Sequence, residues 1–207
     1  MSVVLPTHNE EPLIEAKLTQ LANISYPTER LEIVVVDSST DGTAEVARSF
    51  VNDSNPLDVQ VIKEAERRGV ATAVNTGVDS ATADIIFRTD CDSHIGDETI
   101  SHAVAALQDP TVGGVMGQQT TVLGDSKVET EYRGLQARNQ ALESEIDSTF
   151  IVHGPCFAFR RGDFEPISAD SLADDTEVGV SIRRKNKRII LDPAMGFAES
   201  SVSGMRG

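Results

Sequence analysis

The sequence predicts an α/β fold in which a mostly parallel, Rossmann-like central sheet is flanked by helices. Short β-branched runs alternate with helical patterns through the first half of the chain. The run from Ile33 to Val36 is apolar without alternation, as expected for a central parallel strand that is covered on both faces. With 207 residues, 39% of them hydrophobic, the chain is long enough for one well-buried domain and short for two. We therefore expect a single domain.

The first half predicts four strands with three helices between them. The expected strands are residues 2–5, 32–37, 59–63 and 84–89. The expected helices, which show apolar residues at i, i+3 and i+4, are residues 13–21, 44–51 and 71–79. Asp41 is the expected N-cap of the second helix. Such βαβ units wind right-handed around a parallel sheet.

The second half of the chain is less regular and has longer loops. The expected helices are residues 97–107, 127–146 and 175–185. The expected strands are residues 112–122, as one strand or two, 156–160 and 188–191. Neither an internal repeat nor a low-complexity linker divides the sequence.

The chain is strongly acidic, with 33 acidic and 18 basic residues and a formal net charge of -15. This charge repels phosphate backbones and anionic lipid surfaces, which argues against nucleic-acid binding as the primary role. Only five of the 18 cations are lysine, and the acidic residues are scattered along the chain. The pattern is similar to that of proteins from high-salt cytoplasms, where salt screens the repulsion. An ordinary acidic cytosolic protein is the alternative.

Cysteine usage and hydropathy predict a soluble protein of a reducing compartment. Cys91 and Cys156 lack CxxC spacing and form no disulfide framework. The sequence contains no basic segment before its first apolar run and no stretch of ~18 apolar residues, so we expect neither a signal peptide nor a membrane span.

Three polar segments follow predicted strands, at residues 6–10, 37–43 and 90–92. Ligands of open parallel sheets bind beyond the carboxyl ends of the strands, so we expect these segments to converge on one edge. Asp90 and Asp92 form a DxD pattern after an apolar strand and can share a hard cation such as Mg²⁺ or Mn²⁺ together with substrate phosphates. The alternative for this pair is a solvated turn.

Three further features allow both a functional and a structural interpretation. Asp37 can bind ribose hydroxyls or a base N–H, or it can accept backbone N–H groups of the following turn. Arg67 and Arg68 precede a helix start where a phosphate can bind, or they form an exposed basic turn. Asp174 and Asp175 open a helix, which acidic residues stabilise, and a carboxylate there can also accept a proton from a hydroxyl. The sequence lacks GxGxxG and GxxxxGK[ST], which argues against a Rossmann dehydrogenase and a P-loop enzyme.

With these residues in view, the chain resembles the family 2 glycosyltransferases, which have the GT-A fold. The resemblance runs nearly end to end and keeps the family's order and spacing. It rests on VVLPTHNEE, EIVVVDSSTDGT, RRGVATAVNTG, IIFRTDCDS, HGPCFAFRR and LADDTEVGVSIRRKNKRIILDP. Six ordered motifs are far more specific than one DxD. The resemblance divides the single domain into a nucleotide-binding half, about residues 1–95, and an acceptor and catalytic half, about residues 96–207.

The resemblance also assigns roles to individual residues. The residues implied to bind nucleotide are Pro6, Thr7, His8, Glu10, Asp37, Arg68 and Asp90. His8 stands where the family often places an aromatic ring against the base. Asp90 and Asp92 correspond to the metal-binding DxD pair, with Asp92 as the direct ligand. Asp175 matches the catalytic base, and Asp174 precedes it in a supporting place.

The sequence departs from the family pattern at two positions and lacks one motif. Ser38 stands where the family usually has a second acidic residue, and Asp174 replaces the usual Glu before the base. Members that work at membranes carry a QxxRW segment and transmembrane helices after the region that ends here at residues 203–207. The resemblance therefore implies a soluble piece of a longer enzyme at the cytoplasmic face of the membrane.

The implied reaction is an inverting transfer of one sugar from a nucleoside diphosphate to a hydroxyl of a saccharide or lipid-linked acceptor, with Mg²⁺ or Mn²⁺ as cofactor. The alternative from a different class is a nucleotide-sugar-binding module without turnover. A sugar-phosphate nucleotidylyltransferase is less favoured, because its Gly-rich start with a basic residue is missing after the first strand.

Overall fold

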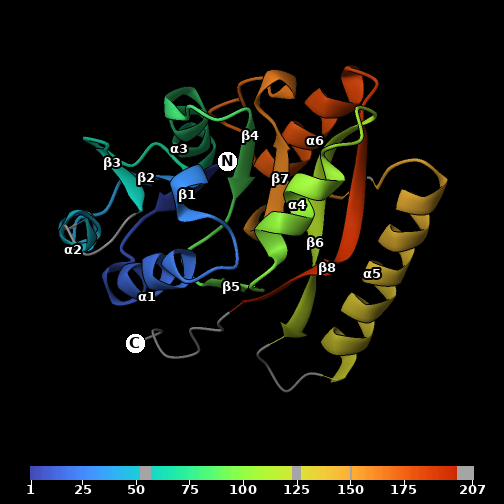
Figure 1. The fold of residues 1–207 in the computed structure, drawn as a ribbon, viewed down its shortest axis with the longest axis horizontal. Helices are drawn as coiled ribbons and strands as arrows, with labels where there is room; N and C mark the ends of the chain where they lie inside the picture. Colours follow the sequence, from blue (N-terminus) through green and yellow to red (C-terminus); the bar gives the residue numbers. More distant parts are fainter. Residues whose placement is uncertain (52–56, 123–126, 150, 200–207) are drawn as a thin grey trace.

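A computed structural model describes residues 1–51, 57–122, 127–149 and 151–199 of the protein. Their strands form one eight-stranded sheet in the order β3-β2-β1-β4-β7-β6-β8-β5, with helices on its faces (Figure 1). The strands are β1 (Ser2–Thr7), β2 (Glu32–Asp37), β3 (Asp58–Lys63), β4 (Ile85–Arg88), β5 (Ser93–Ile95), β6 (Val112–Val122), β7 (Phe157–Arg160) and β8 (Arg188–Glu199). The α-helices are α1 (Glu11–Ala22), α2 (Thr43–Phe50), α3 (Val70–Ser80), α4 (Thr99–Ala106), α5 (Lys127–Ile146) and α6 (Asp174–Arg184). Short 3-10 turns cover Thr28–Arg30, Gly154–Cys156 and Arg161–Asp163.

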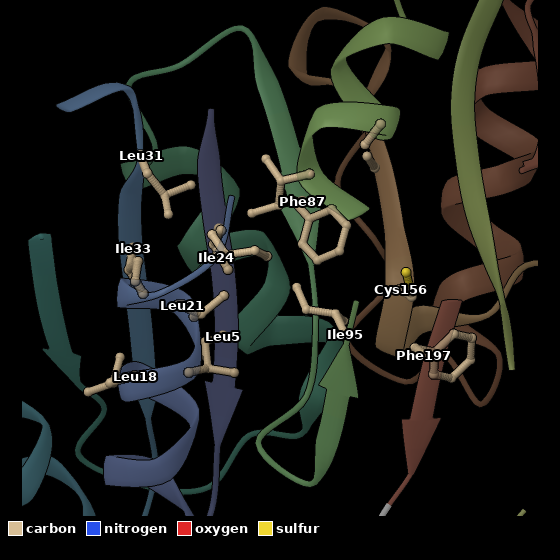
Figure 2. Close-up of a cluster of buried hydrophobic side chains, with 14 of the residues drawn as sticks. Leu5, Leu18, Leu21, Ile24, Leu31, Ile33, Phe87, Ile95, Cys156 and Phe197 are labelled. Carbon is tan, nitrogen blue, oxygen red and sulfur yellow. The ribbon is translucent and has the colours of Figure 1, made fainter. Parts of the chain in front are cut away.

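The first four strands form the parallel part of the sheet. β1 pairs in parallel with β2 and with β4, and β2 pairs in parallel with β3. Successive strand residues point to opposite faces, so Val3 and Leu5 pack into one core and Val4 into the other. Figure 2 shows Leu18 and Leu21 of α1 over the first of these faces. Because α3 covers the opposite face, β1 and β2 are buried on both sides, as their unbroken apolar runs predict.

The remaining strands form a mixed part of the sheet. β7 is antiparallel to both β4 and β6, β8 is parallel to β6, and β5 is antiparallel to β8. α5 and α6 pack near β6 and β8. β5 is the edge strand next to β8, at the opposite end of the sheet from β3. It nevertheless lies beside α1, where Gln20 Nε2 donates to the Ile95 carbonyl over 2.8 Å. The sheet therefore curls so that its last strand returns to the first helix.

Most predicted elements are present, with ends shifted by a few residues. The segment 112–122 is a single strand, β6. α2 begins after Gly42 rather than after Asp41, although the Asp41 carboxylate accepts the backbone N–H of Thr43 over 3.1 Å. The cap prediction was therefore wrong by one residue. Gly42 is the N-cap, and Asp41, one residue before it, still accepts an N–H of the first turn.

Two features of the sheet were not predicted. β5 has three residues, too few to show periodicity. β8 continues eight residues beyond the predicted end at Leu191, past Pro193, which usually ends a strand. This continuation is possible because the register with β6 shifts between Gly117 and Gln118, where the partners on β8 change from Asp192 to Gly196.

In the part of the chain that the structure describes, none of the helices is both long enough and apolar enough to cross a bilayer. Residues 203–207, which precede the expected position of the QxxRW segment, lie outside the described residues.

Candidate active site

A cleft of about 310 Å³ opens at the carboxyl ends of β1 and β4. Its lining joins the loop after β1, the turn after β4 and the start of α3. The lining residues are Pro6, Thr7, His8, Glu10, Ser38, Arg67, Gly69, Val70, Ala73, Arg88, Asp90, Cys91 and Asp92. The structure thus brings together six of the predicted residues, which are Pro6, Thr7, His8, Glu10, Asp90 and Asp92.

The DxD residues stand on a tight turn between β4 and β5. Ser93 closes the turn, because its backbone N–H and its hydroxyl both donate to the Asp90 carbonyl, over 3.3 and 2.8 Å. Burial raises the pKa of Asp90, and the neighbouring carboxylate of Asp92 adds to that shift. Burial also raises the pKa of the Cys91 thiol.

Lys17 supports this turn from inside the protein. Its ammonium group, on a side chain that is buried, donates to Thr89 Oγ1 over 2.9 Å, to the Ser93 carbonyl over 2.7 Å and to Ser93 Oγ over 3.2 Å. Burial lowers the pKa of Lys17 to about 8. A buried cation with three oxygen acceptors thus fixes the residues on either side of the DxD pair.

The mouth of the cleft concentrates negative charge. The pKa of Glu10 is raised by burial and then by the carboxylates of Asp92 and Asp90. Hard carboxylate oxygens that repel one another fit a divalent cation such as Mg²⁺ or Mn²⁺, which takes one or two carboxylates and completes its shell with water and substrate phosphates. Among the described residues, no group of three or more His, Cys, Asp or Glu side chains is arranged to hold a metal alone.

The loop after β1 is tied to the loop after β2. His8 Nδ1 lies 2.9 Å from the Ser38 carbonyl and donates to it, which fixes the ring at the cleft wall. Asn9 has φ of 58°, a left-handed conformation that asparagine tolerates, and its Oδ1 accepts the backbone N–H of Thr40 over 2.9 Å. The two loops thus form one rigid wall of the cleft.

Asp37 is fully buried below the cleft and is not one of its lining residues. Its carboxylate accepts hydrogen bonds from Thr7 Oγ1 over 2.8 Å, from Lys63 Nζ over 2.6 Å and from the Ser39 hydroxyl. Although burial acts to raise the pKa of Asp37, the hydrogen bonds from Lys63, Ser39 and Thr7 lower it overall. The geometry favours the structural interpretation, in which Asp37 organises the loops, and its nucleotide contact stays a prediction.

The two arginines before α3 take different places. Arg67 lines the cleft, whereas Arg68 pairs with Glu64 over 2.7 Å and its side chain is half exposed. Gly69 separates Arg68 from the helix and has φ of 90°, a conformation that favours glycine. Of the two arginines, Arg67 therefore lies at the cleft, and the phosphate contact predicted for Arg68 stays a prediction.

Asp174 and Asp175 begin α6 and meet the parallel part of the sheet at Arg88, the last residue of β4. Arg88 Nη1 lies 2.6 Å from Asp174 Oδ2 and is also ion-paired with Asp175 Oδ1. The backbone N–H of Gly154 donates to Asp175 Oδ2 over 3.0 Å. Neither Asp174 nor Asp175 lines the cleft, but Arg88 does, so one buried guanidinium connects the acidic pair to the cleft wall.

Sequence reasoning did not single out Arg88, Lys17 or Gly154. Arg88 carries a signal that could have found it, because a charged residue that ends an apolar strand must be paired when it is buried. Lys17 stands on the apolar face of a helical pattern, which is a similar signal. Gly154 becomes informative only when its neighbours in space are known.

Comparison with known proteins identifies the family. The sequence profile of Glycosyl transferase family 2 matches residues 2–167. The chain belongs to this family. It is 26% identical over 205 residues to the probable glycosyltransferase YdaM of Bacillus subtilis, covering 94% of this chain and 49% of that protein. It is 28% identical over 167 residues to an N-acetylglucosaminyltransferase of Rhizobium meliloti, covering 78% and 39%.

Solved structures show the same GT-A fold. The mannosyltransferase PcManGT from Pyrobaculum calidifontis, in complex with GDP-Man and Mn²⁺, matches with a TM-score of 0.85 and 35% identity over 100% of this chain and 57% of that one. TarS from S. aureus matches with a TM-score of 0.74, at 21% identity over 97% of this chain and 60% of that one. The family 2 chain described here spans about half the length of the curated relatives it matches.

Proposed function

We propose that this glycosyltransferase moves a sugar from a nucleoside diphosphate onto an acceptor hydroxyl with inversion at the anomeric carbon, with Asp175 as the general base. One observation carries the proposal, which is the ion pairing of Arg88 with Asp174 and Asp175. Arg88 lines the same cleft as Asp90 and Asp92, so this contact sets the proposed base beside the proposed donor site. A module that only binds nucleotide sugars needs no such connection.

The donor would occupy the cleft of the first half, about residues 1–95. Pro6, Thr7, His8 and Glu10 would surround the nucleotide, and Arg67 would face the phosphates. Asp92 would hold a divalent cation, Mg²⁺ or Mn²⁺, and Asp90 would be its second carboxylate. The cation would neutralise charge on the leaving diphosphate. The GDP-Man and Mn²⁺ bound to the similar PcManGT support both assignments.

The acceptor would enter from the second half, about residues 96–207. Asp175 is 27% exposed at its side chain, and because Oδ1 is buried, an incoming hydroxyl would approach the carboxylate at Oδ2. The carboxylate takes the proton of that hydroxyl while the oxygen attacks the anomeric carbon on the face opposite the diphosphate. Arg88 and the Gly154 N–H hold the carboxylate during this transfer.

Donor and acceptor are separate questions within the proposal. GDP-mannose is the first donor to test, because PcManGT shares 35% identity and was solved with it. UDP-GlcNAc, bound in a TarS structure that shares only the fold, is the second. Saccharide and lipid-linked acceptors both fit, and the proposed place of work is the cytoplasmic face of a membrane, reached through a segment beyond this chain.

The test of the function combines donor binding and turnover. Thermal stabilisation with Mn²⁺ and each of the UDP-, GDP- and dTDP-sugars identifies the donor, because specific binding raises the unfolding midpoint. Asp175→Asn keeps the size of the side chain and removes the proton acceptor, so transfer should fall ~10²-fold or more with donor affinity nearly unchanged. Asp174→Asn should have a milder effect.

The non-catalytic alternative predicts different results. A binding module would be stabilised by the donor but would neither transfer the sugar nor hydrolyse the donor in the absence of acceptor. Full transfer by a well-folded Asp175→Asn protein would rule out this residue as the base. Protein that includes the remaining length found in relatives should be assayed beside this chain, so that loss of an acceptor segment is not mistaken for loss of catalysis.

A further inference from the structure

Arg88 is a buried cation at the meeting point of the two parts of the sheet. It ends β4, which has β1 on one side and β7 on the other, and its side chain is 7% exposed. A buried guanidinium is costly unless it is paired, and the described partners of Arg88 are Asp174 and Asp175. The guanidinium is therefore ion-paired with both acidic residues, and its charge also acts on Asp90 of the cleft, where it works to lower the pKa.

The acidic pair has few other contacts that would hold it. α6 starts after Ala173, which makes no side-chain cap, so the first turn of the helix lacks the usual polar anchor. The described hydrogen bond to the Asp175 carboxylate comes from the Gly154 N–H at Oδ2. Arg88 is ion-paired with Oδ1, and the Gly154 N–H donates to Oδ2, so the carboxylate has a different partner at each oxygen, which fixes its plane.

The space around this contact is filled. A Cβ atom on Gly154 would lie 2.5 Å from Asp175 Oδ1 and 2.8 Å from Arg88 Cζ. Gly154 precedes β7, whose first residue, Phe157, pairs with Arg88 across the antiparallel ladder. The backbone of the second half is thus pressed against the guanidinium and the carboxylate together.

We infer that Arg88 is a positioning residue for the reaction, which holds the carboxylate of Asp175 in the orientation needed to accept the acceptor proton. The inference rests on the proposed function, since it gives Asp175 the role of base. Arg88 acts through Asp175, and donor binding belongs to the other residues of the cleft. Removing Arg88 should therefore slow turnover without weakening the donor complex.

The test is a double-mutant cycle with Arg88→Gln, Asp175→Asn and the protein that carries both. Arg88→Gln alone should lower kcat by about tenfold or more, with donor KM and nucleotide affinity within about twofold of the parent. In the Asp175→Asn background, Arg88→Gln should lower the remaining turnover by less than about twofold, because the carboxylate it positions is already absent. Arg88→Lys keeps the charge and should recover part of kcat. Arg183→Gln, which breaks the exposed pair of Arg183 with Asp147 at the other end of α6, is the control and should leave kcat unchanged.

Two results would overturn the inference. One is a double variant whose kcat falls by the product of the two single losses, and the other is a fall in donor affinity on Arg88→Gln as large as the fall in kcat. If Arg88→Gln does not fold, Arg88→Lys takes its place in the cycle. The unfolding midpoints of the same four proteins measure the Arg88–Asp175 contact independently of turnover. If the midpoint changes of the two single variants add up in the double variant, the two residues are not coupled and the inference is wrong. A parent that binds donor but transfers no sugar would instead refute the proposed function, while the midpoints still report whether Arg88 holds the pair.

Discussion

The two parts of the site are built in different ways. In the parallel part, polar residues follow the strands, as His8 follows β1 and Asp90 follows β4, and the sheet aligns the strand ends. In the mixed part, Asp174 and Asp175 start a helix and reach the cleft only through Arg88, 86 residues earlier in the chain. The proposed donor site thus depends locally on strand ends, whereas the placement of the proposed base depends on long-range packing.

The largest effect is expected from Asp92→Ala, which tests whether donor binding belongs to the parallel part alone. Loss of the metal ligand should weaken nucleoside diphosphate binding by about 100-fold in the presence of Mn²⁺, and Asp90→Ala should weaken it less. Calorimetry with and without a chelator measures both. The exposed Asp97, five residues further on, provides the control Asp97→Ala, which should bind normally. Equal affinity of the parent with and without chelator would count against a metal site.

Asp37→Asn tests the stability of the loops in the parallel part rather than ligand binding. Loss of the charged acceptor of Lys63, Ser39 and Thr7 should lower the free energy of unfolding by about 2 kcal/mol at pH 6. Because the pKa of Asp37 is lowered on folding, its contribution is present above the unfolded value of about 3.9 and is lost as pH falls through the folded value. The gap between parent and variant should therefore close below about pH 4.

Urea midpoints measured from neutral to acid pH would show this closing gap. Asp58→Asn, at the exposed start of the neighbouring strand β3, is the control and should keep the parent's midpoint. A gap that stays constant down to the acid limit would mean that the charge of Asp37 is not what stabilises the loops.

Gly154→Ala tests the mixed part. The added Cβ would collide with Asp175 and Arg88, so we expect transfer to fall by about tenfold with donor affinity unchanged. Gly162→Ala is a matched control, since a Cβ there meets no atom within 4 Å. If Gly154→Ala weakens donor binding as much as transfer, the proposal that the two parts separately bind the donor and place the base is wrong.

The smallest effect is expected from salt, which acts on both parts at once. Screening of a net charge of -15 should raise the melting temperature by about 3 °C between low salt and about 1 M KCl, corresponding to about 1 kcal/mol. A melting temperature that is flat or falls would favour the ordinary acidic protein over a salt-adapted one. Neither outcome bears on the site.

The sequence predicted the parallel part closely and the mixed part in outline. The strand Glu32–Asp37 and the helix Lys127–Ile146 have the predicted ends, and for the strand the reason is that charged residues bound an unbroken apolar run. β5 and the second half of β8 were missed, because their pairing depends on partners about 100 residues apart. Residue order alone does not reveal such a pairing.

The same distinction applies to the site. Asp90 and Asp92 were found because a strand end fixes where they lie, and both line the cleft. Arg68 was chosen over Arg67, since a pattern of two adjacent arginines does not show which side chain lines the cleft and which pairs with Glu64, and the phosphate contact of Arg68 stays a prediction. The roles of Asp37, Asp174 and Asp175 stay predictions that the experiments above decide.

The antiparallel pairing of β5 with β8 has a consequence for the order in which the protein assembles. Ser93, next to Asp92, pairs with Glu199. Contacts between residues so distant in sequence form slowly, and during synthesis the N-terminal strands are available first. β1 to β4 can associate before β8 has been synthesised and can pair with β5. We therefore expect β5 to pair late, so that a nascent chain forms the part of the cleft built by β1 to β4 before the strand that follows Asp92 is fixed at the other end of the sheet.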